Sequence, residues 1–211
     1  MSTEAPFDPA ALDWDKVGGM MPVVVQDAAT LRVLMLGYMD RAALDRTLQG
    51  GKVTFFSRSR QRLWTKGETS GNHLELVAVR ADCDADTLLV TARPHGPTCH
   101  TGSTSCFGDA PGQFLGALDA LVRQREHDRP LNSYTTKLFE KGTRHIAQKV
   151  GEEGVETALA GVVQRDDELL GESADLLFHL IVLLRARGLS LDDAVAVLEQ
   201  RHARAAEKAA G

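Results

Sequence analysis

The three cysteines of this 211-residue chain all lie between Cys83 and Cys106, with Cys99 beside His100. A disulfide framework normally has an even number of cysteines, spread over the elements that it links. Three clustered thiols favour a metal site instead. Structural zinc sites have four protein ligands, whereas catalytic sites hold three and leave one position for water. The count therefore favours catalytic zinc, unless His100 is the fourth ligand.

Three acidic residues, Asp82, Asp84 and Asp86, alternate around Cys83. If the segment is an extended strand, the acids share one face and Cys83 projects from the other. The segment would then supply hard oxygen ligands for magnesium and a soft thiolate for zinc. The simpler alternative is a solvated acidic turn with a buried cysteine, because aspartate is common in turns.

The segment 97–107 brings Cys99 and Cys106 together with glycine and small hydroxyl residues, which favours the metal site. His100 is either a ligand or a catalytic base, since an imidazole titrates near neutral pH. Zinc nucleobase deaminases are another class with cysteine ligands, but their paired cysteines have the form P-C-x-x-C. Six residues separate Cys99 from Cys106, so the sequence disfavours that class.

A third segment, WTKGETSGN at residues 64–72, is rich in groups that hold phosphate or sugar. Its glycines allow backbone N–H groups to approach a ligand, and Lys66 adds a positive charge. A surface hairpin is the simpler alternative. Lys66 is also a candidate catalytic residue. The candidate substrate-binding residues are Trp64, Thr65, Lys66, Gly67, Glu68, Thr69, Ser70, Gly71 and Asn72.

Carboxylates also cluster in the second half of the chain. Glu152, Glu153 and Glu156 are three and four residues apart in a predicted helix, and Glu172 and Asp175 are three apart in the next. Side chains at these spacings share a helix edge, where like charges repel. If the two helices pack antiparallel, five carboxylates face one another, and magnesium would make the cluster tolerable. The alternative is two solvated faces of amphipathic helices.

The elements that position these groups differ between the two halves. Short apolar runs separated by polar or glycine-containing breaks predict strands at 22–26, 31–38, 53–57, 74–80 and 87–92, with one helix at 40–48. From Phe114 onward the apolar residues have helical spacing. Helices are predicted from 114 to before Pro130, after Ser133, and over about 143–165, 168–187 and from Ser190.

We therefore expect two domains, a mostly-β α+β domain at 1–110 and an all-α helical bundle at 111–211, joined at 108–112. The hydrophobic fraction of 43% and charged fraction of 25% are typical of globular proteins. A net charge of −5 gives no electrostatic reason to expect nucleic acid or an anionic membrane as partner. Without a secretory signal or an apolar span, a cytoplasmic location is expected.

The strings ADCDAD, GPTCHTGSTSCF and WTKGETSGN resemble the motifs of phosphoribosyl-AMP cyclohydrolase, in the same order, over about residues 14–107. The resemblance implies that Cys83, Cys99 and Cys106 bind zinc, with ligands from both subunits of a homodimer. It implies that Asp82, Asp84 and Asp86 bind magnesium. The implied reaction is hydrolytic opening of the purine ring between N1 and C6.

The helical half resembles the all-α nucleoside-triphosphate pyrophosphohydrolases. The strings SYT, KVGEEGVE and ESADLLFHLIVLL are similar to phosphoribosyl-ATP pyrophosphohydrolase in particular, over about residues 118–201. This implies that Glu152, Glu153, Glu156, Glu172 and Asp175 hold magnesium on the triphosphate, and that Lys149 contributes to phosphate binding. Together, the halves resemble the bifunctional enzymes that act on phosphoribosyl-ATP and then phosphoribosyl-AMP in histidine biosynthesis.

Two other classes stay open at this point. A zinc-binding interaction module fused to a helical dimerisation domain would give the carboxylates no role. A housecleaning nucleoside-triphosphate pyrophosphohydrolase would use the helical half alone and leave the cysteine segment without catalytic function.

Overall fold

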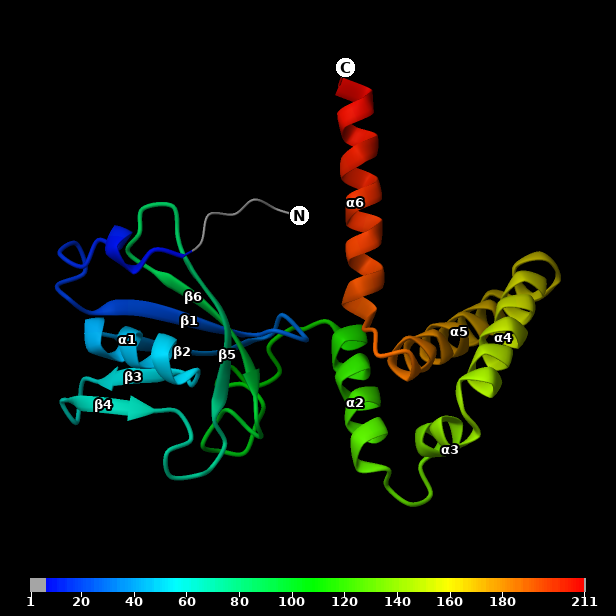
Figure 1. Cartoon of the computed structure of the whole chain (residues 1–211), viewed down its shortest axis with the longest axis horizontal. Helices are drawn as coiled ribbons and strands as arrows, with labels where there is room; N and C mark the ends of the chain where they lie inside the picture. The colour runs from blue at the N-terminus through cyan, green and yellow to red at the C-terminus, as the bar shows by residue number, and fades with distance from the viewer. Residues whose placement is uncertain (1–6, 211) are drawn as a thin grey trace. The chain divides into compact units, whose positions relative to one another are not determined.

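The computed structural model describes residues 7–210 of the chain, with side chains up to residue 206. Its contacts divide the chain into two compact units after Phe114 (Figure 1). The division falls four residues beyond the expected boundary, because the segment before Phe114 is fastened to the first unit. The Gln113 backbone N–H donates to the Thr30 carbonyl at 2.6 Å, and Gly112 lies against the Arg32 side chain.

The first unit contains a four-stranded sheet and a separate two-stranded one. The order in the larger sheet is β2 (Val33–Met39), β1 (Met21–Asp27), β6 (Leu88–Pro94) and β5 (Leu74–Ala81). The β1–β6 pair is parallel and the other two pairs are antiparallel. β3 (Thr54–Ser57) and β4 (Arg62–Thr65) form the antiparallel hairpin. This mixed arrangement agrees with a mostly-β α+β domain.

Alternating burial along the strands builds the core of this unit. Met21, Val23 and Val25 on β1 are fully buried, and the residues between them are half-buried. Helix α1 (Arg41–Gly50) lies beside β3 (Figure 1). Asp40 caps it by accepting a hydrogen bond from the Ala43 backbone N–H at 2.7 Å, as the sequence predicted.

The structure corrects two expectations for this unit. Strand β4 was not predicted, because its four residues show no apolar alternation: the first is exposed and the next three are half-buried. The segment 82–86 is not an extended strand but the turn between β5 and β6. An oxygen of Asp82 accepts hydrogen bonds from the backbone N–H groups of Asp86 at 3.0 Å and Thr87 at 3.1 Å. These local bonds favour the turn over a continued strand.

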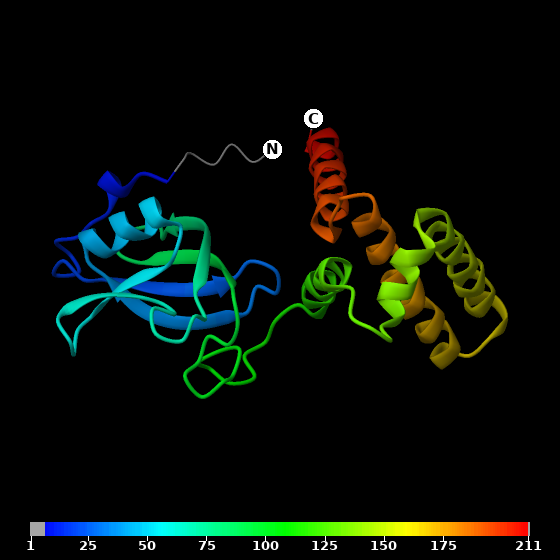
Figure 2. The same ribbon diagram turned by 60° about the horizontal axis from the view of Figure 1, so that its bottom comes forward.

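Five helices make up the second unit in the described part of the chain: α2 (Phe114–Asp128), α3 (Tyr134–Lys141), α4 (Thr143–Val163), α5 (Asp166–Ala186) and α6 (Leu191–Ala210). α4 and α5 lie side by side as a hairpin (Figure 2). Ser190 and Asp193 form the predicted capping box at α6, with hydrogen bonds of 2.8 and 3.2 Å. None of the helices in residues 7–210 is long and apolar enough to cross a membrane.

A small core holds these helices together. Val122, Leu138, Ile146, Ile181 and Val182 are buried against one another. The buried Asp119 of α2 accepts a hydrogen bond from Arg185 Nε of α5 at 2.9 Å. Because this ion pair is shielded from solvent, each charge is stabilised mainly by the other.

Candidate functional sites

A cavity of about 650 Å³ in the first unit brings two of the predicted segments together. One wall comes from β4 and the segment after it, and another comes from the loop after β6. Of the nine candidate substrate-binding residues, six line it: Trp64, Lys66, Gly67, Thr69, Ser70 and Asn72. Cys99, His100 and Cys106 line the same cavity. Two separate sequence motifs therefore form one site.

The remaining residues of the 64–72 segment have structural partners. Glu68 forms an ion pair with Arg62 at 2.5 Å, which lowers the pKa of its carboxyl group. The Thr65 hydroxyl lies 3.0 Å from that of Thr54 on the neighbouring strand. Gly71 has a φ of 78°, a conformation that favours glycine. These residues shape the segment whose other members reach the cavity.

The loop with Cys99 and Cys106 is fixed against β2. The Cys106 backbone N–H donates to the Leu34 carbonyl, and the buried Ser105 hydroxyl donates to the Val33 carbonyl, both at 2.8 Å. The environments of the two thiols shift their pKa values in opposite directions. The Thr101 hydroxyl lies 3.1 Å from Cys99 Sγ and, with nearby N–H and hydroxyl groups, lowers the pKa of that thiol to about 6.

Burial, and then the neighbouring Cys99, raise the pKa of the Cys106 thiol. Two adjacent sulfur atoms, one of them readily ionised, form a donor set that suits zinc. The pair therefore fits a zinc ion, although two thiolates do not complete a site.

Cys83 does not join that pair within one chain. It lies exposed on the turn between β5 and β6, where its Sγ is 4.0 Å from an oxygen of Asp84. In the described residues, no group of three potential metal ligands combines Cys83 with Cys99 and Cys106. The structure of one chain therefore does not gather the three thiols that the resemblance implies as zinc ligands.

The three aspartates converge although their segment is a turn. Asp82, Asp84 and Asp86 each offer an oxygen within 4.8 Å of the others. Lys16 forms ion pairs with Asp84 and, at 2.6 Å, with Asp86. These contacts raise the pKa of the lysine and lower those of both carboxyl groups. The cluster thus attracts a cation, and its oxygen ligands suit magnesium.

In the second unit, Glu153 and Glu156 of α4 and Glu172 of α5 offer carboxylate oxygens within 4.8 Å of one another. Glu153 is buried, with 8% of its side chain exposed. Burial, followed by repulsion from the neighbouring carboxylates, raises the pKa of Glu172. Clustered carboxylates that repel one another are a donor set suited to a divalent cation.

The other two predicted acids lie differently. Glu152 is directed to Lys149, at 2.9 Å, and to the Gln148 amide, at 2.8 Å. It is not part of the group within 4.8 Å. Asp175 is outside that group too, but its charge contributes to the raised pKa of Glu172. Lys149 also lies 3.5 Å from Glu153, so it partly balances the cluster.

Sequence reasoning missed a buried histidine next to this cluster. His179 lies on α5, and its Nε2 is 2.9 Å from the Tyr134 hydroxyl of α3. Its Nδ1 is 2.9 Å from the Asp175 carbonyl and 3.5 Å from a Glu153 oxygen. Lys16 was missed likewise. Lys16 lies 68 positions from Asp84, and His179 lies 45 positions from Tyr134, so the fold brings these groups together.

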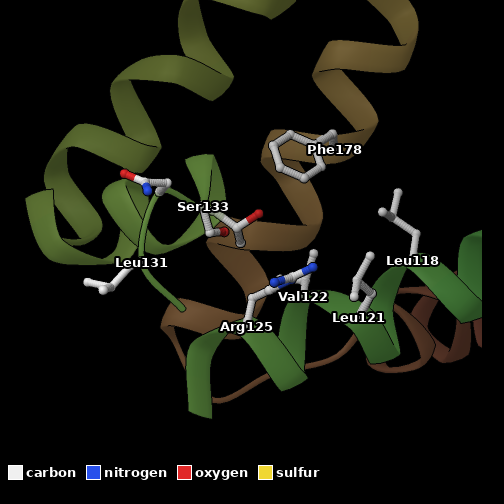
Figure 3. Close-up of a pocket in the computed structure, with 9 residues that line it drawn as sticks. Leu118, Leu121, Val122, Arg125, Leu131, Ser133 and Phe178 are labelled. Atoms are coloured by element: carbon white, nitrogen blue, oxygen red, sulfur yellow. The ribbon is translucent and has the colours of Figure 1, made fainter. Parts of the chain in front are cut away.

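A smaller cavity of about 370 Å³ lies between α2, the start of α3 and α5 (Figure 3). Leu118, Leu121 and Val122 form its apolar side, and Arg125 and Ser133 are among its polar groups. None of the five predicted carboxylates lines it. The carboxylate cluster is therefore separate from this cavity.

The two units match two different families. A family model described as phosphoribosyl-AMP cyclohydrolase matches residues 35–108, and one described as phosphoribosyl-ATP pyrophosphohydrolase matches residues 115–202. The chain belongs to the bifunctional family that joins these two enzymes. The match places the cysteine and aspartate clusters in the cyclohydrolase domain and the glutamate cluster in the pyrophosphohydrolase domain.

Similar proteins extend along nearly the whole chain. The histidine biosynthesis bifunctional protein HisIE of Xanthomonas axonopodis pv. citri is 75% identical over 92% of this chain and 94% of its own length. The protein of the same name from Xylella fastidiosa strain Temecula1 is 75% identical over 90% of this chain and 93% of its own. The protein of the same name from Escherichia coli K12 is 58% identical over 90% of this chain and 95% of its own length. The similarity to each of these proteins thus covers both units of the chain.

Proposed function

We propose that the chain catalyses two consecutive hydrolytic reactions of histidine biosynthesis. The pyrophosphohydrolase domain releases pyrophosphate from phosphoribosyl-ATP, and the cyclohydrolase domain then opens the adenine ring of the resulting phosphoribosyl-AMP between N1 and C6. The observation that carries this proposal is the match of two consecutive enzymes to two units of one chain, each with its own cluster of metal-type ligands. The domains therefore stand in the chain in the reverse order of the reactions.

In the pyrophosphohydrolase domain, Glu153, Glu156 and Glu172 would hold magnesium, with Asp175 close by. Bound magnesium would neutralise negative charge on the triphosphate. Lys149 contributes a further positive charge beside Glu153. His179 acts on this site indirectly, because its ring lies between Tyr134 and the cluster. The chain thus positions the triphosphate for attack by water.

In the cyclohydrolase domain, Cys99 and Cys106 would hold zinc together with Cys83 of a second copy. Bound zinc would supply Lewis acidity, which lowers the pKa of water to about 7. His100 lines the cavity beside Cys99 and accepts the proton of the attacking water. The water oxygen bonds to C6, the N1–C6 bond breaks and His100 returns its proton to N1, while the second proton of the water leaves the new hydroxyl group to solvent. C6 keeps its amino group and becomes a carboxamide carbon.

Lys66 and its neighbours bind the substrate in this scheme. Lys66 is only 8% exposed. It lies close enough to Cys106 that its positive charge acts to lower the pKa of that thiol. A buried cation beside the reacting ring suits a phosphate group attached to it. The aspartate cluster on the β5–β6 turn would hold magnesium in place of the Lys16 contact.

A homodimer fits both the incomplete zinc site and the surface of the helical domain. Val155, Leu159 and Val162 form a stripe along α4 at helical spacing, and they are 61, 55 and 82% exposed. Leu170 on α5 is 70% exposed. Such an apolar surface on paired helices is typical of an interface, and a second copy of α4 and α5 would cover it.

Substrate selectivity tests this function against the housecleaning alternative. The full chain with magnesium is expected to release pyrophosphate from phosphoribosyl-ATP far faster than from ATP or a panel of deoxynucleoside triphosphates. The physical reason is that only phosphoribosyl-ATP carries a second ribosyl phosphate for the site to recognise. Pyrophosphate release can be measured with a coupled phosphate assay. Equal rates across the panel would support general triphosphate hydrolysis instead.

A further inference from the structure

The turn between β3 and β4 contributes a wall of the larger cavity that no predicted motif includes. Ser57, Ser59 and Arg60 line it together with Lys66 and Cys99. The turn is well defined, because the Ser57 hydroxyl accepts from the Arg60 backbone N–H at 3.3 Å and the Gln61 amide donates to the Arg58 carbonyl at 2.6 Å. These bonds define the backbone from which Ser59 and Arg60 project.

Two arginines lie on this turn and a third begins β4, and two of the three are engaged by the protein. The Arg58 guanidinium lies 3.8 Å from the centre of the Tyr38 ring. Arg62 forms the ion pair with Glu68. The Arg60 side chain makes no hydrogen bond or ion pair within residues 7–210, yet it lines the cavity. Its charge also helps, as a minor cause, to lower the pKa of the Glu68 carboxyl group, and its N–H groups stay available to a ligand.

An arginine that lines a cavity together with two serine hydroxyl groups is a phosphate-binding arrangement. Arginine presents paired N–H donors that match phosphate oxygens, and hydroxyl groups can donate to the same oxygens. The hydroxyl oxygens of Ser57 and Ser59 lie 3.4 Å apart, so both can reach one phosphate group. The turn thus forms a second cationic region in a cavity that already contains Lys66.

The two regions lie at opposite ends of β4. Arg60 precedes this strand and Lys66 follows it, and its four extended residues advance about 13 Å. Phosphoribosyl-AMP likewise carries two phosphates on opposite sides of its purine, one on the ribose at N1 and one on the ribose at N9. Lys66 lies near Cys106, and hence near the reacting N1 and C6 atoms. The Arg60 region would then face the N9 side.

We propose that Arg60, with Ser57 and Ser59, binds the 5′-phosphate of the N9 ribose of the substrate. This inference rests on the proposed cyclohydrolase function. It assigns the two ends of the cavity different tasks, because Lys66 holds the phosphate next to the reacting bond and Arg60 holds the distant one. Arg60 is a binding residue and takes no part in the proton transfers.

Binding of AMP and adenosine tests this assignment without relying on turnover. AMP carries the N9 phosphate, adenosine lacks it, and ribose 5-phosphate represents the N1 side. Calorimetry on the zinc-loaded full chain is expected to show tighter binding of AMP than of adenosine. Arg60→Met should weaken AMP about 10- to 100-fold, the usual effect of losing a charged hydrogen bond. It should leave adenosine and ribose 5-phosphate unchanged.

Kinetics provide the second measurement. Arg60→Met should raise KM for phosphoribosyl-AMP by a similar factor with little change in kcat, and Arg60→Lys should recover part of the loss. Arg58→Met is the matched control, since it removes the same charge from the same turn but not from the cavity. Zinc content confirms that the variants are folded.

An unchanged preference for AMP over adenosine in Arg60→Met would overturn the assignment, as would selective loss of ribose 5-phosphate binding. These outcomes differ from failure of the proposed function, in which the wild-type chain does not open the ring of phosphoribosyl-AMP at all.

Discussion

Replacement of Cys99 with alanine is expected to lower the rate of adenine ring opening to below about 1% of wild type, since even the partners of metal ligands contribute 10- to 100-fold. Cys99 is the thiol whose pKa is lowered to about 6, so at neutral pH it supplies a thiolate to the proposed zinc site. Zinc content should fall with the activity. Release of pyrophosphate should be unaffected, because that cluster contains only carboxylates.

His100→Asn is the matched comparison at the neighbouring residue. If His100 is a base, this variant keeps its zinc while turnover falls about 10²- to 10⁴-fold. Loss of zinc from His100→Asn would instead make His100 a ligand. An unchanged zinc content in Cys99→Ala would contradict the assignment of Cys99.

Co-expression of two variants can distinguish a zinc site shared between two copies from a site within one chain. Cys83→Ala should be as inactive in ring opening as Cys99→Ala. When the two variants are co-expressed, a mixed dimer has one site with Cys83 from one copy and both Cys99 and Cys106 from the other. Partial recovery of activity is therefore expected. A site within one chain predicts no recovery, because each chain then lacks one ligand.

The second large effect is expected for Glu153→Gln. Glu153 is the buried member of the carboxylate cluster and contacts Lys149 and His179 as well. Removing its charge should lower pyrophosphate release from phosphoribosyl-ATP about 100-fold or more, as expected for a metal ligand. The magnesium concentration for half-maximal activity should rise. Circular dichroism should show wild-type helix content, because glutamine fits the same space.

Glu152→Gln provides the control, since Glu152 is the adjacent residue but is directed to Lys149 and Gln148. It should reduce pyrophosphate release much less than Glu153→Gln. A larger loss in Glu152→Gln than in Glu153→Gln would contradict the cluster that the structure indicates. Ring opening of phosphoribosyl-AMP should be unchanged in both variants, because neither residue belongs to the cyclohydrolase domain.

Several features could be predicted from the sequence because they depend on neighbouring residues. The caps at Asp40 and Ser190 rest on hydrogen bonds to residues three positions away. The spacing of Glu153 and Glu156 places both on one helix edge by geometry alone. Their meeting with Glu172 followed from a short connection between α4 and α5, which makes the helices antiparallel neighbours.

Other features required the fold. Asp82–Asp86 alternates like a strand, but hydrogen bonds from the backbone to Asp82 make it a turn. Lys16 meets Asp84 across 68 positions, and the Tyr134 hydroxyl meets His179 across 45. The sequence alone does not distinguish Arg60 from the neighbouring Arg58 and Arg62. Only the contacts of the other two with Tyr38 and Glu68 distinguish it.

Mass spectrometry of the products formed from phosphoribosyl-ATP tests the central claim most directly. The full chain is freed of zinc, its metal content is measured, and it is then incubated with magnesium alone or with magnesium and zinc. Magnesium alone should give pyrophosphate and accumulating phosphoribosyl-AMP. Addition of zinc should convert phosphoribosyl-AMP into a product heavier by one water molecule. Ring-opened product at the same rate without zinc, or pyrophosphate release that also requires zinc, would contradict two separate metal sites acting in succession.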